Sequence, residues 1–204
     1  THMSRFIEVL NEYREDIHIK NFEHILNEIK RTLEAQSAHM EVEFPYFIEK
    51  TAPVTGSAGL MEYRCTLMGM VGARREFKVG VKVPIQTLCP CSKEISDFGA
   101  HNQRGIVTVV VRYEKFFWME DLIEIIEGCG SSQVYPLLKR PDEKYVTEEA
   151  YANPRFVEDV VRQAAHLLSG RSEFSWFSVE AENIESIHNH SAYAYIESEQ
   201  PHGR

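Results

Sequence analysis

The chain has 204 residues, of which 43% are hydrophobic and 26% charged, a composition typical of an ordinary globular protein. It carries 31 acidic and 22 basic side chains, and the resulting net charge of −9 argues against broad electrostatic binding to nucleic acid or an anionic membrane. Neither a secretory leader nor an apolar run near the ~20 residues of a membrane span is present, which favours a cytoplasmic location. Four cysteines are too few for a secreted disulfide framework, so reduced thiols or metal ligation are expected.

The first part of the chain predicts helices followed by strands. Apolar residues recur at the spacing of one helical face and then, from Met40, at every second position. Pro45 suggests that the first strand is an edge strand or contains a bulge. The expected elements are helices over 4–13 and 22–33 and strands over 40–48 and 61–71, the two strands paired across a turn at 53–59.

The second part predicts two strands, two helices and two further strands. Pro84 is expected to limit the first of these strands, and Gly128 to end the first helix. Asn153 can cap the last helix, Pro154 suits its first turn and Gly170 terminates it. The expected elements are strands over 75–85, 106–113, 172–183 and 190–197 and helices over 119–126 and 154–168, with loops over 86–105 and from Gly128 to about 152.

This order of elements predicts an α+β protein with an antiparallel sheet and two helices on one face. The first part of the chain has the same order but lacks an opening pair of strands. We therefore expect two tandem modules, a partial one over 1–72 and a complete one over 73–204 that carries most of the site residues.

Cys89 and His101 flank a polar loop that can fold both side chains onto one centre. A thiolate and an imidazole suit zinc or a similar divalent ion. Two ligands do not complete a site, and the alternatives are a loop cysteine beside a hydrogen-bonded histidine, or a redox pair formed by Cys89 and Cys91.

A second cluster precedes the last expected strand. Glu185, His188 and His190 combine a carboxylate with two imidazoles, which suits proton transfer near neutral pH. Side-chain alternation would place both histidines on one face. The alternative is a polar surface turn.

Two other carboxylates have ordinary explanations on the residues alone. Glu143 belongs to a charged run typical of a solvated loop. Glu158 lies on the last helix, where an ion pair with Arg162 one turn later would account for it.

Three segments resemble the type IB GTP cyclohydrolases, a metal-dependent family of bacteria and archaea. They are the opening Thr-His-Met-Ser-Arg-Phe, the block Leu-Cys-Pro-Cys-Ser-Lys-Glu-Ile-Ser-Asp-Phe-Gly-Ala-His-Asn-Gln-Arg from Leu88, and Glu-Ser-Ile-His-Asn-His from Glu185. The resemblance implies a tunnelling fold with two modules per subunit and a homotetramer with active sites at subunit interfaces. Members of the family carry a further N-terminal segment, so this chain is expected to begin inside the first module.

The resemblance also implies roles for individual residues. The metal, which could be zinc, manganese or iron, would be held by Cys89, His101 and Glu143, and Glu158 would recognise guanine. The catalytic groups would be Glu185, His188 and His190 together with Cys89. Cys91 matches a cysteine able to form a disulfide with the ligand thiol.

The implied reaction converts GTP into 7,8-dihydroneopterin triphosphate and formate, for folate, pterin or deazapurine biosynthesis. We expect Lys93 and Arg104 to bind the triphosphate, with Arg74 or Arg75 of a neighbouring subunit. The rival hypotheses are a related enzyme with another purine or pterin substrate, a protein that binds such a ligand without turnover, and a thiol redox protein.

Overall fold

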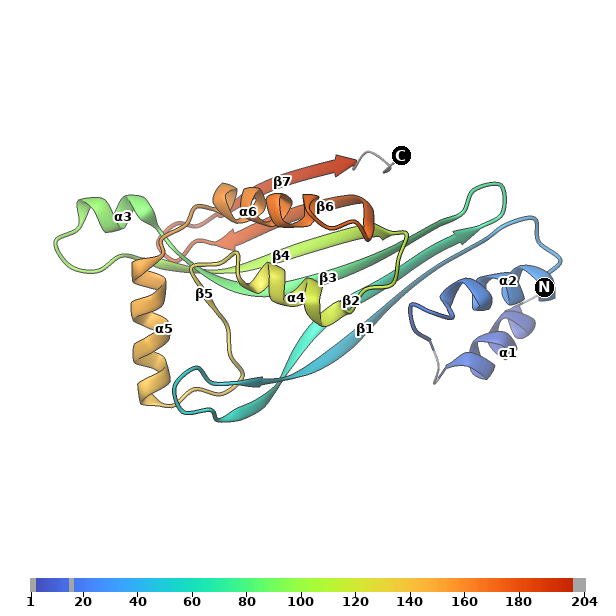
Figure 1. Cartoon of the computed structure of the whole chain (residues 1–204), viewed down its shortest axis with the longest axis horizontal. Coiled ribbons are helices and arrows are strands. Elements are labelled where there is room, and N and C mark those ends of the chain that lie inside the picture. The colour runs from blue at the N-terminus through green and yellow to red at the C-terminus, as the bar shows by residue number, and fades with distance from the viewer. Residues whose placement is uncertain (1–2, 15–16, 200–204) are drawn as a thin grey trace.

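A computed structural model describes residues 3–14 and 17–199 and shows one antiparallel sheet crossed by helices (Figure 1). The strand order is β1-β2-β3-β4-β6-β7, and the short β5 pairs with β3 away from this path. Every pairing is antiparallel, which confirms the predicted sheet type. The strands are β1 (Ala38–Thr51), β2 (Ala58–Val71), β3 (Glu76–Leu88), β4 (Asn102–Tyr113), β5 (Ser132–Gln133), β6 (Phe174–Ile184) and β7 (Ser191–Glu199).

The helices pack on the sheet through apolar faces. The second helix lies on β1 and β2, the fourth contacts β3, and the sixth covers β6 and β7. None of the described helices is long and apolar enough to cross a bilayer. The helices are α1 (Met3–Tyr13), α2 (Phe22–Thr32), α3 (Pro90–Ile95), α4 (Met119–Glu127), α5 (Arg140–Ala152) and α6 (Val157–Ser169).

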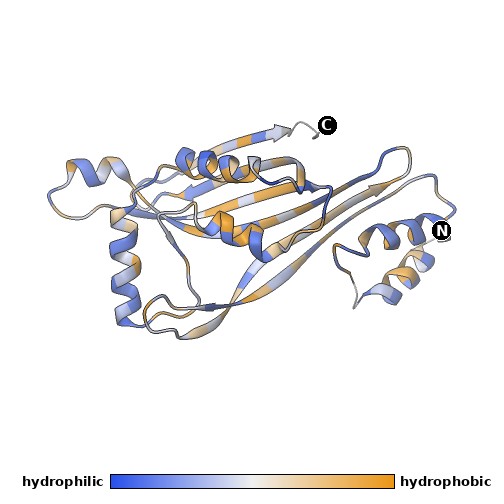
Figure 2. Ribbon diagram, viewed as in Figure 1, coloured by the Kyte–Doolittle hydropathy of each residue, from blue (hydrophilic) through white to orange (hydrophobic). Residues whose placement is uncertain are grey.

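One continuous apolar cluster joins the packed helices to the sheet. Alternate residues of the central strands, such as Val79 and Val109, are fully buried in it, and Figure 2 shows the corresponding hydrophobic stripes. At Gly69 of β2 an added Cβ would lie 2.6 Å from Leu26 and 2.7 Å from Phe22, so glycine allows the close approach of α2. Burying this apolar surface is the main stabilisation of the fold.

Both predicted helices and both predicted strands of the first part are present, and β1 pairs with β2 as expected. β1 is an edge strand among the described residues, in agreement with the prediction from Pro45. β2 pairs with β3 only from Arg64 to Met70, so the β1–β2 hairpin extends beyond its neighbour.

The expected end of β3 at Pro84 was wrong, because the strand continues to Leu88. Gln86 accepts a hydrogen bond at its carbonyl oxygen from Ser131, on the side away from β4. Backbone groups of alternate residues point the same way, so Pro84 also faces away from β4. Beside Pro84, β2 has already separated from β3 and β5 has not yet begun. No strand therefore needs a hydrogen bond from the backbone nitrogen of Pro84.

Two predicted loops contain helices. The loop over 86–105 includes α3 and also the start of β4, which begins at Asn102 and not at 106, and the loop after Gly128 includes β5 and α5. α5 buries few apolar side chains, such as Val146 and Ala150, and so leaves no strong periodic signal.

The predicted start of the last helix at 154 was also wrong. α6 begins at Val157, after Phe156, whose backbone N–H donates to Asp159 at 3.0 Å. Asn153 does not cap it but donates from its amide to the carbonyl oxygens of Gly130 and Ser131.

The division into modules over 1–72 and 73–204 stays a prediction. The strands of both parts form one sheet, and the order of elements is the one expected, with α3, β5 and α5 added. Residues 1–2, 15–16 and 200–204, which these bounds include, lie outside the described ranges.

Candidate active site

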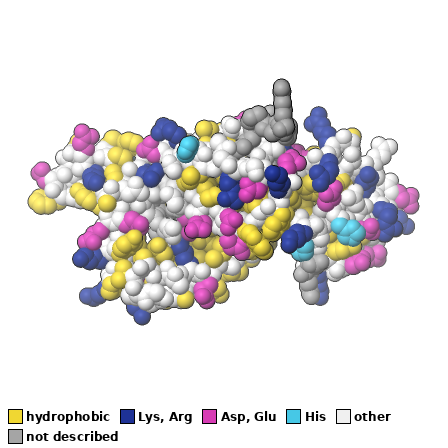
Figure 3. All heavy atoms as spheres, viewed as in Figure 1, with side chains coloured by type: hydrophobic (Ala, Val, Ile, Leu, Met, Phe, Trp, Pro, Cys, Tyr) yellow, Lys and Arg dark blue, Asp and Glu magenta, His cyan; other side chains and the backbone are white. Residues whose placement is uncertain are grey.

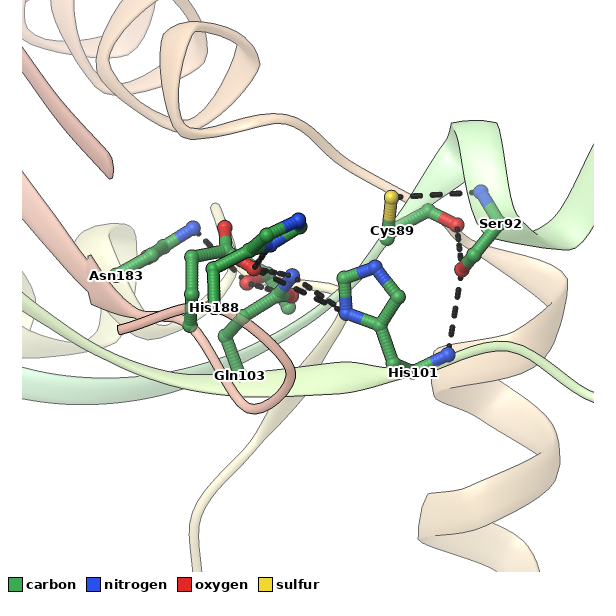
Figure 4. Close-up of polar contacts among 8 residues, drawn as sticks. Cys89, Ser92, His101, Gln103, Asn183 and His188 are labelled. Atoms are coloured by element: carbon green, nitrogen blue, oxygen red, sulfur yellow. Dashed lines mark hydrogen bonds and ion pairs between the residues drawn. The ribbon is translucent and has the colours of Figure 1, made fainter. Parts of the chain in front are cut away.

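Cys89 and His101 are held side by side where β3 ends and β4 begins (Figure 4). The Cys89 backbone N–H donates to the His101 carbonyl oxygen at 3.0 Å. Ser92 of α3 ties both residues further, since its hydroxyl donates to Cys89 O at 3.2 Å and accepts from His101 N at 3.2 Å. The structure therefore brings together the two residues that were expected to share a centre.

The two side chains differ in how their polar atoms are engaged. The Cys89 sulfur caps α3 by accepting from Ser92 N at 3.4 Å. The His101 ring, whose side chain is 14% exposed, uses Nδ1 for its contacts, at 3.2 Å from Gln103 Nε2 and 3.9 Å from Glu185 Oε2. Nε2 is thus the nitrogen that can face a bound ion.

The second predicted cluster lies beside the first. Glu185 Oε2 is 4.0 Å from His188 Nδ1, and the rings of His101 and His188 meet edge-on at 6.4 Å. His188 stacks on His190 with ring centroids 5.1 Å apart. Both histidines precede β7 in a loop, so ring stacking and not strand alternation brings them together, which corrects the argument from alternation.

Beneath these groups lies a buried polar network that the sequence analysis missed. Gln103, Thr87 and Asn183 come from three neighbouring strands and are 6%, 0% and 3% exposed. Gln103 donates to Glu185 and accepts from Thr87, and Thr87 accepts from Asn183. A signal did exist, because Gln103 is in phase with the inward-facing Val107 and Val109, and a polar residue there needs a partner.

Glu143 does not join Cys89 and His101 within one chain. It is exposed on the first turn of α5. The other end of that helix, at Tyr151, contacts Lys93 of α3, so Glu143 is ~12 Å further along the helix axis. Among the described residues, no group of three or more His, Cys, Asp or Glu side chains is arranged to hold a metal ion.

Glu158 is exposed on the first turn of α6, near the positive end of the helix dipole. The expected pairing with Arg162 was wrong, since Arg162 binds Asp159 at 2.8 Å. An ion pair with Arg162 therefore does not explain the presence of Glu158.

The cations expected to bind a triphosphate are dispersed. The Lys93 ammonium donates to the Tyr151 carbonyl oxygen and lies 4.4 Å from the Tyr151 ring. Arg104 is exposed on β4, and Arg75 forms two 2.7 Å bonds with Glu23 near the β2–β3 turn. On the face shown in Figure 3, basic and acidic side chains are interspersed.

Burial separates the four cysteines into two kinds. It raises the pKa of Cys65 to about 12 and that of Cys129 to about 11, so both stay protonated at neutral pH. Cys91 is exposed and Cys89 is partly exposed. Only Cys89 and Cys91 are therefore placed for ligand or redox chemistry.

The fold is similar to that of urate oxidases. Bacillus sp. TB-90 urate oxidase matches with a TM-score of 0.59 and 8% identity, over 98% of this chain and 79% of that one. A hyperthermostable mutant of the same enzyme matches with a TM-score of 0.55 and 11% identity, over 97% and 76%. At this identity the likeness shows the fold alone, an α+β fold like that of the urate oxidases.

Sequence comparison identifies the family. Residues 1–194 match the model of the family described as "Type I GTP cyclohydrolase folE2". The GTP cyclohydrolase FolE2 of Geobacter sulfurreducens is 62% identical over 200 residues, 98% of this chain and 78% of that protein. The FolE2 of Geobacter sp. (strain M21) is 63% identical over 197 residues, 97% of this chain and 74% of that protein. The chain belongs to the FolE2 family of GTP cyclohydrolases, which confirms the resemblance to GTP cyclohydrolases.

Proposed function

We propose that this chain is a GTP cyclohydrolase of the metal-dependent, type IB kind, which converts GTP into 7,8-dihydroneopterin triphosphate and formate. Family membership carries the activity, as the first step of pterin or folate biosynthesis. The observation that supports the proposed chemistry is the meeting of Cys89 and His101 with Glu185 and His188 at one end of the sheet.

A divalent ion fits the first of these pairs. Cys89 offers sulfur and His101 offers Nε2, donors that suit zinc or iron, and Glu143 would be the third ligand and add the oxygen donor that manganese prefers. Such an ion would supply an activated water for attack at C8 of the guanine ring.

The remaining residues would bind the nucleotide and move protons. His188 and His190 would carry protons beside Glu185, because an imidazole can both donate and accept near neutral pH. The Glu158 carboxylate would accept hydrogen bonds from N1 and the exocyclic amino group of guanine, a pair of donors that adenine does not offer. Lys93 and Arg104 would contact the triphosphate, and for Lys93 this requires release from Tyr151.

We further propose a homotetramer with active sites between subunits. Two features favour it: Glu143 lies far from Cys89 within one chain, and β1 and β7 each leave one edge of the sheet unpaired among the described residues. Most soluble oligomers are closed and symmetric, and such an assembly can cover strand edges and bring Glu143 of one subunit to Cys89 of another.

The test is formate release from GTP by the purified protein, with zinc, manganese or iron supplied in turn. We expect turnover that a chelator abolishes and that metal restores. GTP binding without formate release would contradict the proposal and favour a non-catalytic purine or pterin protein, and turnover of a different purine or pterin alone would favour a related enzyme. Disulfide reduction that survives chelation would favour a thiol redox protein.

A further inference from the structure

Gln103 links the two halves of the candidate site. Its Nε2 donates to Glu185 Oε2 at 2.9 Å and lies 3.2 Å from His101 Nδ1 (Figure 4). We propose that Gln103 is a positioning residue that holds the Glu185 carboxylate between His101 and His188. This inference rests on the proposed function, because it gives Glu185 a part in that reaction.

The other end of the Gln103 side chain is anchored in the sheet. Its Oε1 accepts the Thr87 hydroxyl at 3.1 Å, and Thr87 Oγ1 in turn accepts from Asn183 Nδ2 at 3.0 Å. Thr87 is the direct cross-strand partner of Gln103 in the β3–β4 pairing. The anchor is therefore built into three adjacent strands and not into a loop.

The chain of hydrogen bonds runs in one direction, from Asn183 through Thr87 to Gln103 and then to Glu185. A carboxamide has one donating end and one accepting end. Because the accepting end of Gln103 is taken by Thr87, its amino group is turned towards Glu185. A glutamate at this position would present oxygen where the amino group now donates.

Close packing keeps the network in place. An added Cβ at Gly105, the cross-strand partner of Asn183, would lie 2.4 Å from Asn183 Oδ1, so any side chain there would displace the Asn183 amide. Asn183 Oδ1 itself is buried without a hydrogen-bond partner. Such an atom costs stability, and its retention here is explained if the amide must point its donor at Thr87.

The consequence for the site is that one carboxylate oxygen is fixed for two histidines. Glu185 Oε2 lies 3.9 Å from His101 Nδ1 and 4.0 Å from His188 Nδ1. Without the amide, the Glu185 side chain, which belongs to the loop after β6, would have no hydrogen bond to another described residue to keep it there. Catalysis depends on such fixed geometry to within fractions of an ångström.

The test is the Gln103→Met substitution, which keeps the length of the side chain and removes its polar end. We expect kcat to fall ~10–100-fold, as for other residues that orient a metal site, while the KM for GTP changes less than about threefold. Gln103→Glu should lose at least as much, because its oxygen would face the Glu185 oxygen. Turnover by Gln103→Met within about twofold of the parent protein would overturn the proposal.

Gln86→Met is the matched control. Gln86 lies on the adjacent strand, and its amide oxygen accepts a hydrogen bond from the Ser132 hydroxyl at 3.0 Å. We expect its kcat to stay within about twofold of the parent value. An equal loss of kcat in both variants would mean that general damage to the sheet, and not positioning, causes the effect.

A double-mutant cycle with Glu185→Gln separates positioning from a merely structural role. If Gln103 acts through Glu185, adding Gln103→Met to Glu185→Gln should lower kcat by less than about twofold more. Additive losses would overturn the proposal. Metal affinity, measured by competition with a chelator, gives a second readout, and we expect it to weaken in Gln103→Met and not in Gln86→Met.

The two proposals fail in different ways. A parent protein that binds metal but releases no formate from GTP refutes the proposed function and this inference with it. An active parent with an equally active Gln103→Met variant refutes the positioning role alone.

Discussion

Cys89 and Cys91 are separated by one residue but differ in what they contact. Cys89 caps α3 and is bonded through its backbone to His101, whereas Cys91 is exposed on the helix surface. The proposed metal chemistry therefore requires one of these thiols and not the other.

Cys89→Ala and Cys91→Ala form a matched pair that tests this difference. We expect Cys89→Ala to lose bound metal and to lower turnover by more than ~100-fold, because a direct ligand matters more than its supports. Cys91→Ala should keep its bound metal and its turnover under reducing conditions. Metal content and formate release, measured on the same samples, would contradict the assignment if Cys89→Ala remained loaded and active.

Glu158 is exposed on the first turn of α6 and does not pair with Arg162, which binds Asp159. Glu158→Gln keeps the shape of the side chain and replaces one acceptor oxygen by a donor. We expect KM for GTP to rise by ~10–100-fold with metal content unchanged, as a charged hydrogen bond to the base is lost. Asp159→Asn, on the same turn, is the control, and normal GTP affinity in Glu158→Gln would refute guanine recognition by this residue.

At the scale of the element, α5 is fixed by Asp142. Burial raises the pKa of this carboxyl, but backbone N–H groups of Thr55, Lys139 and Val54, with the Thr55 hydroxyl, outweigh it and hold the pKa well below its usual range. A lowered folded-state pKa stabilises the fold above the ordinary aspartate pKa of ~3.9, and this stabilisation is lost as the pH falls below it.

We therefore expect Asp142→Asn to lower Tm at neutral pH, and the difference from the parent to narrow below about pH 4. Thermal unfolding across this range is the measurement. Glu148→Gln is a control on the same helix, because its exposed pair with Lys144 at 3.8 Å contributes little. A Tm difference that stayed constant from neutral to acidic pH would show that the carboxylate charge is not the cause.

The elements with a strong periodic signal were predictable, and the others were not. Alternation in β3 and the apolar stripe of α2 identified both elements from local residues. α5 escaped because its anchor, Asp142, binds residues far away in the sequence. The prediction that Pro84 limits β3 failed for a similar reason. A proline is accepted inside this strand because β2 separates from β3 before Pro84, and that separation cannot be read from local residues.

The residues of the candidate site also divide into those that the sequence identifies and those that it does not. Cys89, His101 and the residues from Glu185 to His190 stand out by type, and the structure brings them together. Gln103 was missed because the predicted loop over 86–105 included it, whereas β4 begins at Asn102, and because its partners Thr87 and Asn183 lie on adjacent strands. Roles for Glu143 and Glu158 came only from family resemblance and stay predictions.

At the scale of the whole molecule, the described sheet has two edge strands. β1 and β7 each have a neighbour on one side only among the described strands. Unpaired strand edges favour association with further copies.

We expect light scattering to give a mass four times that of one chain, independent of concentration over the range used for assays. Glu143→Gln and Cys89→Ala proteins, each inactive alone, should regain part of the activity when dissociated and reassembled together, because mixed interfaces can combine the two intact ligands. A stable, fully active monomer would contradict sites shared between subunits.

The β1–β2 hairpin reaches past the sheet that supports it. Residues 58–63 of β2 pair only with β1 among the described strands, and the turn beyond them is tied to α5 where Val54 and Thr55 meet Asp142. The next residue after Asp142 is Glu143. Because this turn is bonded to Asp142, we expect a change in its length to move Glu143, the proposed metal ligand, together with the helix whose other end contacts Lys93.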